Sequence, residues 1–526
     1  MNLSDLVHAT ALRQPAQVAL KAGEKQLDYA GLAGEMETVA AGLQGLGLAR
    51  YDRVAVYLDK RIETVAAIFG AFAAGLVAVP VNPVLKPHQV GHILRDSGAR
   101  ALVSSAARID TLGLELPATR VARIVSIDGG PSGDAGAVLD WVGLREAGTH
   151  HGVDVHPLDT DMAAILYTSG STGHPKGVVL SHRNVVVGGR SVASYLENHP
   201  GDRLLATLPL SFDAGFSQLT TAFASGATVV LHNYLMPRDV PKVCAREGIT
   251  GLTAVPPLWM QLVQATWPDA ARESLRYFAN TGGRMPRDVL NKLRGLFPEA
   301  KPFLMYGLTE AFRSTYLDPS EVDRRPDSIG KAIPNVEIQV VKRDGALAGP
   351  GEEGELVHRG PLVAMGYWND TRRTAERFKP APAQPAGLPL AEIAVWSGDT
   401  VRLDDEGFLY FVGRRDEMIK TSGYRVSPTE IEEVLFDSPH VREAAAFGVP
   451  HPTLGEAIVA AVVPKDPADE AMHKAVLDHC RTELPRFMVP SEVTRHDTLP
   501  RSPNGKIDRK ELATAYRSMF TEEAEA

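Results

Sequence analysis

Short runs of apolar residues alternate with amphipathic stretches along most of the chain. The runs at 54–58, 77–81 and 101–103 are continuous and rich in valine and alanine, which is typical of buried strands. Residues 62–74 have the apolar spacing of a helix, and a second helix is expected over 87–96. Strands that alternate with helices through short connections predict parallel sheets with right-handed crossovers.

Three further apolar runs, at 204–208, 228–231 and 251–255, continue this alternation. The pattern changes from Asp399, where short strands separated by the acidic turn at 404–407 look like hairpins. The segments expected after them are a helix at 428–436, strands at 444–448 and 457–463, and a helix at 470–484. We therefore expect an N-terminal domain over residues 1–415 and a C-terminal domain over residues 416–526.

The length and charge of the chain narrow the class of protein. With 526 residues, the chain is long enough for two to four domains. Its apolar content of 44% and charged content of 23% are ordinary for a globular protein. The net charge of −9, with both signs mixed along the chain, argues against a nucleic-acid partner. Local groups, and no general positive field, must therefore bind any anionic substrate.

The two cysteines, Cys244 and Cys480, lie far apart and form neither a disulfide framework nor a zinc pattern. This usage favours a reducing compartment. The first residues lack a basic region followed by an apolar core, so we expect no signal peptide. Glycines interrupt the apolar stretch at 64–81, so no membrane span is expected and a cytoplasmic location is favoured.

A polar, glycine-rich stretch from Tyr167 to Gly177 follows the strand-like run at 163–166. Glycine lets backbone N–H groups approach a polyphosphate, hydroxyls donate further hydrogen bonds, and a lysine places its charge on an anionic oxygen. The candidate phosphate-binding residues are Thr168, Ser169, Gly170, Ser171, Thr172, Gly173 and Lys176. The stretch is not a Walker A loop, because Pro175 precedes the lysine and Gly177 follows it.

A second polar segment, from Tyr306 to Glu310, follows the strand-like run at 303–305. The carboxyl end of a strand is where α/β proteins bind ligands. Thr309 could donate a hydrogen bond to a phosphate, and Glu310 could coordinate Mg²⁺, which prefers oxygen ligands. The alternative is that this segment only caps the start of a helix.

Two further segments carry candidate ligand-binding residues. Asp399 ends an expected loop before a strand at 401–403, and its carboxylate could accept hydrogen bonds from two adjacent ribose hydroxyls. Gly413 and Arg414 lie in the next expected hairpin, and a turn over 280–283 lies between the two candidate phosphate segments. Each segment alone also fits a plain surface turn, so the assignment depends on their order along the chain.

The motifs and their order closely resemble those of the AMP-forming adenylating superfamily, which includes acyl-CoA synthetases, peptide-synthetase adenylation domains and beetle luciferases. The resemblance extends from the loop at 167–177 to Lys506. It implies an α/β fold class: a large N-terminal domain of doubly wound sheets with a small barrel-like β subdomain, then a small mobile α+β C-terminal domain. The stretch at 306–316 is similar to acyl-CoA ligases associated with exosortase systems and to prolyl-type adenylating enzymes.

The resemblance also assigns roles to residues that match the motifs. Glu310 would hold Mg²⁺, and Thr309, Glu310 and Lys506 would be catalytic. Besides the loop residues, the implied ATP-binding set is Gly282, Gly283, Tyr306, Gly307, Asp399 and Arg414. The implied acid pocket comprises Phe212, Asp213, Gly282 and Tyr306.

The C-terminal motifs complete the resemblance. Asp416 matches the hinge about which the small domain rotates, although a surface salt bridge is the alternative role. In the run at 420–432, Gly423 would let a pantetheine arm pass and Arg425 would meet a phosphate of the thiol carrier. Ser427, with a glutamate at 430, fits a helix capping box.

The nature of the acid is left open by the sequence. Phe212-Asp213 occupies a position where amino-acid-activating relatives use an Asp to bind the substrate ammonium, but Asp213 could equally cap the helix at 214–224. The expected enzyme is an AMP-forming ligase that uses ATP, Mg²⁺ and coenzyme A. An amino-acid adenylating enzyme that serves a separate carrier protein is the alternative. A non-catalytic nucleotide sensor is disfavoured, because the charged motif residues are retained.

Overall fold

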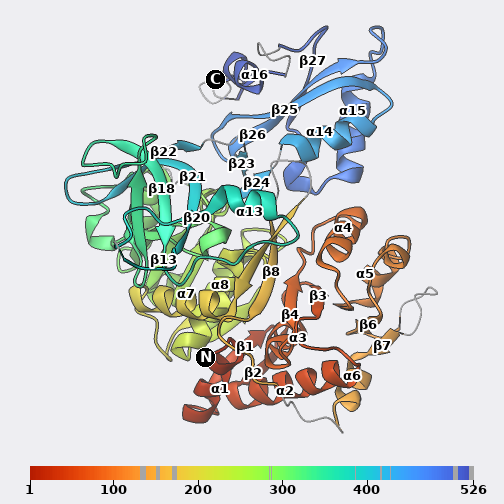
Figure 1. Cartoon of the computed structure of the whole chain (residues 1–526), viewed down its shortest axis with the longest axis vertical. Helices are drawn as coiled ribbons and strands as arrows, with labels where there is room; N and C mark the ends of the chain where they lie inside the picture. Colours follow the sequence, from red (N-terminus) through yellow and green to blue (C-terminus); the bar gives the residue numbers. More distant parts are fainter. Residues whose placement is uncertain are drawn as a thin grey trace.

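The computed structural model describes residues 1–520 except 131–137, 150–154, 169–174, 284, 286, 386, 415–417, 427 and 501–506. Figure 1 shows a large body that holds most of the chain and a smaller C-terminal part that lies against one side of it. The amino terminus lies in the lower half of the large body, and the small part lies at the top of the view.

An eight-stranded sheet contains the first of the expected parallel strands. Its order is β19 (Gly366–Tyr367), β9 (Lys176–Ser181), β8 (Met162–Thr168), β4 (Val77–Pro80), β3 (Arg53–Tyr57), β5 (Ala101–Ser104), β6 (Arg123–Ser126) and β7 (Val138–Asp140). The strands from β8 to β7 pair in parallel, whereas β9 is antiparallel to both of its neighbours. The candidate phosphate loop therefore connects the antiparallel strands β8 and β9.

Helices cover both faces of this sheet, as a doubly wound fold requires. Successive residues of β3 point to opposite faces. Val54 and Val56 join a cluster with α2 (Tyr29–Gly45) and α3 (Ile62–Ala73). Ala55 and Tyr57 join a second cluster with α4 (Pro87–Ser97).

A fourteen-stranded sheet forms the other half of the large body. The order is β17 (Glu337–Val341), β18 (Glu353–Arg359), β21 (Ile393–Leu403), β22 (Leu409–Arg414), β16 (Ser328–Ala332), β15 (Thr315–Leu317), β14 (Lys301–Tyr306), β13 (Tyr277–Asn280), β12 (Gly251–Ala254), β10 (Arg203–Ala206), β11 (Thr228–Leu231), β1 (Val18–Ala22) and β2 (Lys25–Asp28), with β20 (Phe378–Pro380) beside β21. The strands from β14 to β1 are parallel. From β15 to β17 the order continues through antiparallel pairs, which correspond to the expected small β subdomain.

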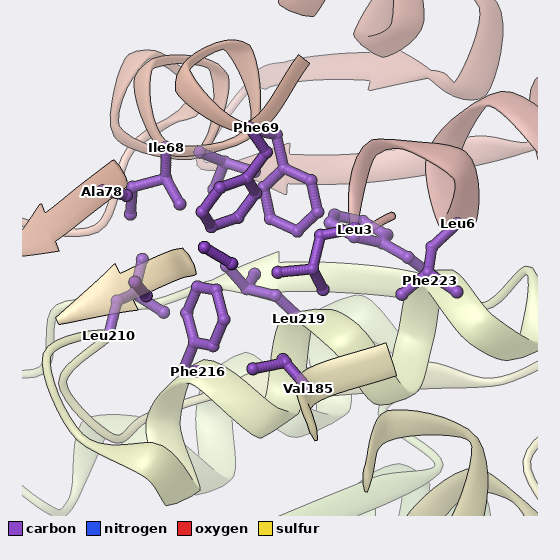
Figure 2. Close-up of a cluster of buried hydrophobic side chains, with 14 of the residues drawn as sticks. Leu3, Leu6, Ile68, Phe69, Ala78, Val185, Leu210, Phe216, Leu219 and Phe223 are labelled. Carbon is purple, nitrogen blue, oxygen red and sulfur yellow. The ribbon is translucent and has the colours of Figure 1, made fainter. Parts of the chain in front are cut away.

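The two sheets are joined through helices that share one buried cluster (Figure 2). Phe69 of α3 stacks on Phe216 of α8 (Asp213–Ser225), with ring centroids 6.4 Å apart, and meets the edge of Phe223 at 5.1 Å. Leu3, which directly precedes α1 (Ser4–Arg13), and Val185 of α7 (His182–Tyr195) complete the cluster. These buried aromatic side chains hold the two sheets in a fixed relation, which positions the ligand-binding ends of their strands.

The remaining helices of the large body are α5 (Ala106–Thr111), α6 (Trp141–Ala147), α9 (Asp239–Glu247), α10 (Pro256–Leu262), α11 (Asp269–Ser274), α12 (Arg287–Leu296) and α13 (Thr371–Arg377). Single 3₁₀ turns are η1 (Leu116–Ala118), η2 (Thr309–Ala311) and η3 (Pro319–Glu321). A separate buried cluster, which includes Trp259 and Phe278, packs α9 to α12 against the parallel strands of the large sheet.

The C-terminal part is a five-stranded sheet with helices on both faces. Its elements are β24 (Tyr424–Val426), β23 (Ile419–Thr421), β26 (Gly455–Pro464), β25 (Val441–His451), β27 (Glu492–Arg495), α14 (Pro428–Asp437), α15 (Met472–Glu483), η4 (Arg486–Met488) and α16 (Arg509–Ala515). Ala444 and Ala446 of β25 face α14 and α15, while Ala445 and Phe447 face α16. This alternation gives the small part its own core on each side of the sheet.

Contacts between α4 and the C-terminal helices connect the two parts. The Gln89 side chain donates a hydrogen bond to Oε1 of Glu430 at 3.2 Å. Nδ1 of His88 lies 3.9 Å from Oε2 of Glu483, and both of these side chains are largely exposed. The C-terminal part is thereby held over the end of the eight-stranded sheet that carries the candidate phosphate loop.

The predicted α/β fold class is confirmed, and one local prediction is wrong. We expected a loop at 397–399 before a strand at 401–403, but Ser397 to Asp399 lie within β21 (Ile393–Leu403). Gly398 adopts a positive φ of 70°, and the pairing with β22 shifts register between Thr400 and Val401. The strand thus continues through a bulge, at the position where the sequence pattern predicted a break. Gly413 and Arg414 end β22, which pairs with β21 as the second strand of a hairpin.

Candidate active site

One cavity of about 1150 Å³ lies between the large body and the C-terminal part. It is lined by residues from both sheets of the large body and from the strands β23 and β24. The predicted site residues that line it are Thr168, Lys176, Phe212, Asp213, Gly282, Gly283, Tyr306, Gly307, Thr309, Glu310, Gly423 and Arg425. The fold thus brings together segments that are distant in sequence.

Lys176 and Glu310 form an ion pair in this cavity. Lys176 is the first residue of β9, and its Nζ lies 3.2 Å from Oε1 of Glu310 in η2. The hydroxyl of Tyr367 donates a hydrogen bond to the same oxygen at 2.6 Å and accepts one from Lys176 at 2.9 Å. Tyr367 was not predicted from the sequence. Its position beside β9 arises from the short strand β19, and a two-residue strand leaves no periodic signal.

The environment keeps Glu310 ionised. Burial alone raises the pKa of this carboxyl group, but Lys176, the Tyr367 hydroxyl and Arg425 together lower it to about 2. Glu310 is only 9% exposed. Because its pKa is low, it carries a negative charge inside the protein at neutral pH. A buried carboxylate next to a phosphate-binding loop is a suitable ligand for Mg²⁺, which commonly takes one or two carboxylates together with substrate phosphates.

Thr168 is the last residue of β8 and directly precedes the candidate residues 169–173 of the phosphate loop. Its Oγ1 is buried and has no hydrogen-bond partner within the described residues. A buried hydroxyl without a partner is unfavourable, and a phosphate oxygen would satisfy it. The other candidate loop residues, Ser169, Gly170, Ser171, Thr172 and Gly173, lie outside the described residues.

Asp399 and Tyr306 lie together although 93 positions separate them in sequence. The Tyr306 hydroxyl donates a hydrogen bond to Oδ2 of Asp399 at 2.6 Å, and Asp399 is 1% exposed. Arg414 is the register partner of Asp399 across β21 and β22. Tyr306, the last residue of β14, therefore lines the cavity, and Asp399 of β21 lies behind it through this hydrogen bond.

The acid-pocket residues Phe212 and Asp213 lie at the start of α8. The helix begins at Asp213, so Phe212 occupies the N-cap position, and no side chain caps this helix. The sequence-based alternative, in which Asp213 is the N-cap, is therefore wrong. The half-buried Asp213 lines the cavity, and burial raises its pKa against the opposing charges of Arg313 and Arg425.

Glycines border the cavity where two segments approach closely. Gly282 and Gly423 have φ of 78° and 81°, respectively. A Cβ atom at Gly423 would lie 2.9 Å from the side chain of Val255, and one at Gly282 would lie 3.2 Å from it. Both positions therefore need glycine for backbone conformation and for space. The neighbouring Tyr424 packs its ring against Phe212, with centroids 5.1 Å apart.

Several predicted site residues lie outside the part of the chain that the structure describes. Asp416, Ser427 and Lys506 are outside the described set. Among the described residues, no group of three or more His, Cys, Asp and Glu side chains could hold a metal ion. No described helix has the length and apolar character needed to cross a membrane.

Two family models match the chain: "AMP-binding enzyme" over residues 7–368 and "AMP-binding enzyme C-terminal domain" over residues 430–506. A long-chain-fatty-acid–CoA ligase of Escherichia coli O157:H7 is 32% identical and covers 99% of this chain and 96% of its own length. An L-proline–[L-prolyl-carrier protein] ligase of Pseudomonas fluorescens is 31% identical, with coverage of 97% and 98%.

Two solved structures of one relative differ in their similarity to this chain. An o-succinylbenzoate CoA synthetase double mutant from Bacillus subtilis, bound to a CoA product analogue, gives a TM-score of 0.81 at 27% identity and covers 97% of this chain and 98% of its own. The same enzyme in complex with its acyl-adenylate intermediate gives 0.67, with coverage of 96% and 97%. The structure as a whole is thus more similar to the complex with the CoA analogue. The chain belongs to the family of AMP-binding enzymes.

Proposed function

We propose that this chain activates a carboxylic acid with MgATP as an acyl adenylate and then transfers the acyl group to the thiol of coenzyme A. The observation that carries the proposal is the single cavity in which Lys176, Glu310 and Thr168 meet Asp213 and Gly423. A carboxylate is a poor acyl donor, because its oxygen leaves badly. When a carboxylate oxygen attacks the α-phosphorus of ATP, pyrophosphate is released and AMP becomes bonded to that oxygen, which can then leave the acyl carbon as part of AMP.

The described residues fit MgATP on three separate observations. Thr168 has a buried hydroxyl without a partner among described residues, Glu310 is held ionised, and Asp399 lies with Tyr306 where a ribose would be recognised. We assign Lys176 and Thr168 to the phosphates, with Ser169 to Gly173 of the same loop, and Asp399 and Arg414 to the ribose side. A bound magnesium ion would neutralise charge on the phosphates.

In this assignment the protein works by positioning and charge compensation, as in other phosphoryl chemistry. Glu310 orients the metal, and Thr309 donates a hydrogen bond to a phosphate. Lys506 stabilises the charge that develops on oxygen during attack at the α-phosphorus. No residue needs to form a covalent bond to the acyl group.

For the second half-reaction, we assign the thiol passage to Gly423 and Arg425 of the C-terminal part. Gly423 lies against Val255 with no room for a side chain, so its backbone forms a thin wall of the cavity. Arg425 also lines the cavity and supplies a charge for a phosphate of the thiol carrier. The higher similarity to the CoA-analogue complex supports assigning the described arrangement to thiol transfer.

We further propose that the two parts are domains, 1–415 and 416–526, that rotate about Asp416 between the half-reactions. This boundary falls between the two family matches, which end at 368 and begin at 430. Rotation would replace the face of the C-terminal domain that carries Gly423 by another face and would bring Lys506 to the cavity. The residues Leu499 and Ile507, which flank the Lys506 segment, pack against β25 and do not line the cavity.

A second candidate function is that of an amino-acid adenylating enzyme that loads a separate carrier protein. Asp213 favours it, because this carboxylate lines the cavity and is not used to cap α8. The similarity to the L-prolyl-carrier ligase supports it as well.

Pyrophosphate release separates the two candidates. The purified chain is assayed with MgATP across fatty, aryl and amino acids, with and without coenzyme A. Formation of an acyl-CoA product from a plain carboxylic acid supports the first candidate. Turnover with amino acids only, and no CoA product, supports the second. If no acid in the panel releases pyrophosphate, the ligase function itself is wrong.

A further inference from the structure

A buried guanidinium group lines the cavity beside the candidate acid site. Arg313 is 2% exposed and follows Glu310 closely in sequence. Its Nη1 donates a hydrogen bond to Oγ1 of Thr281 at 2.7 Å, while its Nε has no partner within the described residues. A buried charge with unused donors is unfavourable unless another group accepts from it. The cavity is the place from which such an acceptor can come.

The backbone conformation directs this side chain into the cavity. Phe312 has φ 55° and ψ −52°, and the backbone N–H of Arg313 donates to the carbonyl of Ala311. This is a γ-turn of the rare positive-φ type, which is strained for a residue with a side chain. The ring of Phe312 packs on the protein side, where it contacts Gly188 of α7. The turn therefore directs two consecutive side chains in different directions: Phe312 packs in the core, and Arg313 lines the cavity.

Neighbouring residues leave room for the arginine. A Cβ atom at Gly307 would lie 3.2 Å from Cα and 3.4 Å from Cδ of Arg313. Gly307 thus allows the arginine stem to pass directly beneath the strand end that carries Tyr306. Strained backbone that is held in this way is found preferentially at functional sites.

Charge complementarity within the cavity gives the chemical class of the ligand. Asp213 and Arg313 line the same cavity, and Arg313 is the largest of the charges that oppose the effect of burial on the pKa of Asp213. Arg313 directs its hydrogen bond to Thr281 and not to Asp213. A purely apolar acyl chain would leave the buried Nε of Arg313 without an acceptor, whereas an acid with a second acceptor oxygen supplies one to the guanidinium group.

We propose that Arg313 is a specificity-determining residue that binds a carboxylate or carbonyl oxygen in the acid, remote from the carboxyl group that is activated. The preferred substrates are short acids with such a second acceptor, of which dicarboxylic acids are the simplest. Asp213 accepts a hydrogen bond from an ammonium group where the acid carries one. The inference rests on the proposed function, because it assumes that the cavity binds the acid to be activated.

Matched acids test the proposal. The full chain is assayed for MgATP-dependent pyrophosphate release with hexanoate, adipate, adipate monoamide, norleucine and 2-aminoadipate, and the plain acids, diacids and monoamides are repeated at eight and ten carbons. We expect kcat/KM to be at least tenfold higher for the diacid or monoamide than for the plain acid at one or more lengths. Equal or higher kcat/KM for the plain acid at every length would overturn the inference and leave the ligase function intact. Absence of release from every acid would overturn both.

The variant Arg313→Met removes the charge and keeps a side chain of similar length. We expect it to abolish the preference for the acceptor-bearing acid, while Arg313→Lys retains part of it. The matched control is Arg325→Met, which removes another buried arginine that pairs with Asp404 and does not line the cavity. That control should leave the ranking of acids unchanged, and an unchanged ranking in Arg313→Met would contradict the proposal.

Folding of the variants is checked by thermal unfolding and by binding of a fluorescent ATP analogue. If Arg313→Met does not fold, Thr281→Val provides the second test, because it removes the oxygen that fixes Nη1 of Arg313. We expect this variant to raise KM for the acceptor-bearing acid at least fivefold and to change kcat by less than twofold. An equal effect on the plain acid would indicate a general structural role and would refute the selection by Arg313.

Discussion

Glu310, Lys176 and Tyr367 illustrate how three distant positions produce one charged site. Each of the three contacts the other two, and the carboxylate is stabilised although it is buried. Because opposing charges and a hydroxyl outweigh desolvation, the pKa of Glu310 falls and does not rise. Variants of the site residues can therefore be distinguished by three measurements: the pH dependence of stability, the rates of the two half-reactions, and the preference among acids.

The charge of Glu310 predicts a pH-dependent contribution to stability. Its pKa is about 2 in the folded protein against an ordinary value of 4.5. A lowered pKa stabilises the folded state above about pH 4.5, and this contribution is lost as the pH falls towards 2. It amounts to about 3 kcal/mol at most. We expect the difference in free energy of unfolding between wild type and Glu310→Gln to shrink between pH 6 and pH 3.

Chemical denaturation at several pH values measures this difference. Glu352→Gln is the matched control, because Glu352 pairs with Lys342 at an exposed site where an ion pair contributes little. A difference for Glu310→Gln that is independent of pH would contradict the assignment of a low pKa. At neutral pH, pyrophosphate release by Glu310→Gln should fall at least a hundredfold, since the metal ligand is lost.

Lys506→Ala should separate the two half-reactions. Removal of the lysine eliminates charge stabilisation during attack on the α-phosphorus, so adenylate formation should decrease at least a hundredfold. Thiolysis of a supplied acyl adenylate by CoA should remain within a few-fold of wild type. Single-turnover assays of each step measure the two rates, and an equal loss in both would contradict the role assigned to Lys506.

Asp213→Asn tests whether the substrate carries an ammonium group. The variant keeps the shape of the side chain but loses the charge, which weakens a charged hydrogen bond by about 1.5–3 kcal/mol. If amino acids are substrates, kcat/KM for them should fall about 10- to 100-fold, while a plain acid of the same length serves as the internal control. Unchanged amino-acid turnover would exclude the amino-acid candidate.

At the level of elements, the sequence pattern predicted those strands whose burial is continuous. The run at 228–231 matches β11 (Thr228–Leu231), and the helix expected at 62–74 matches α3 (Ile62–Ala73), because each has a clear period and a clear end. The segment at Ser397–Asp399 was mistaken for a loop, since a glycine and a bulge inside a long strand have the same composition as a turn. A local sequence pattern does not show which other strand a segment pairs with.

The same limit applied to the site. The motif residues Lys176, Glu310 and Asp399 could be predicted, because they stand in characteristic local sequences. Tyr367 and Arg313 were missed, because their importance arises only from tertiary contacts. The one signal in the sequence was an arginine three positions after Glu310, close to a predicted ligand-binding strand end.

The segment β23–β24 provides a prediction for the thiol-transfer step. Gly423→Ala places a Cβ 2.9 Å from Val255 and forces a side chain into a φ of 81°. The turn must move, so CoA-dependent thiolysis should fall at least tenfold while adenylate formation changes little. Gly407→Ala is the matched control, since Gly407 has a φ of 84° but no atom within 4 Å of the added Cβ. A similar loss in both variants would attribute the effect to backbone strain alone.

On the scale of the whole molecule, the contacts between α4 and α15 report on the relation of the two proposed domains. His88 and Glu483 are exposed, and their polar atoms lie 3.9 Å apart. The native cysteines, Cys244 and Cys480, are both buried. A pair of cysteines introduced at 88 and 483 can therefore be joined selectively by a short bismaleimide.

Cross-linking His88→Cys with Glu483→Cys should trap the described arrangement. We expect adenylate formation to stop, because the proposed rotation is blocked, and thiolysis of a supplied acyl adenylate to continue. Each single variant treated with the same reagent is the control. Adenylate formation and thiolysis by the doubly substituted chain are measured after the cross-link has been confirmed by mass spectrometry. Unimpaired adenylate formation in the linked protein would refute the proposed domain rotation.

The backbone reversal at Phe312 has a consequence for how this scaffold can diversify. The direction of the side chain at 313 is set by the main chain and by the anchored ring of Phe312, so a change of residue at 313 need not disturb Glu310. The residue proposed to select the acid and the residue proposed to support its activation are therefore close in sequence, yet one can be substituted without moving the other. Directed evolution confined to 313 and its hydroxyl neighbour Thr281 could reprogramme selectivity without rebuilding the reaction centre.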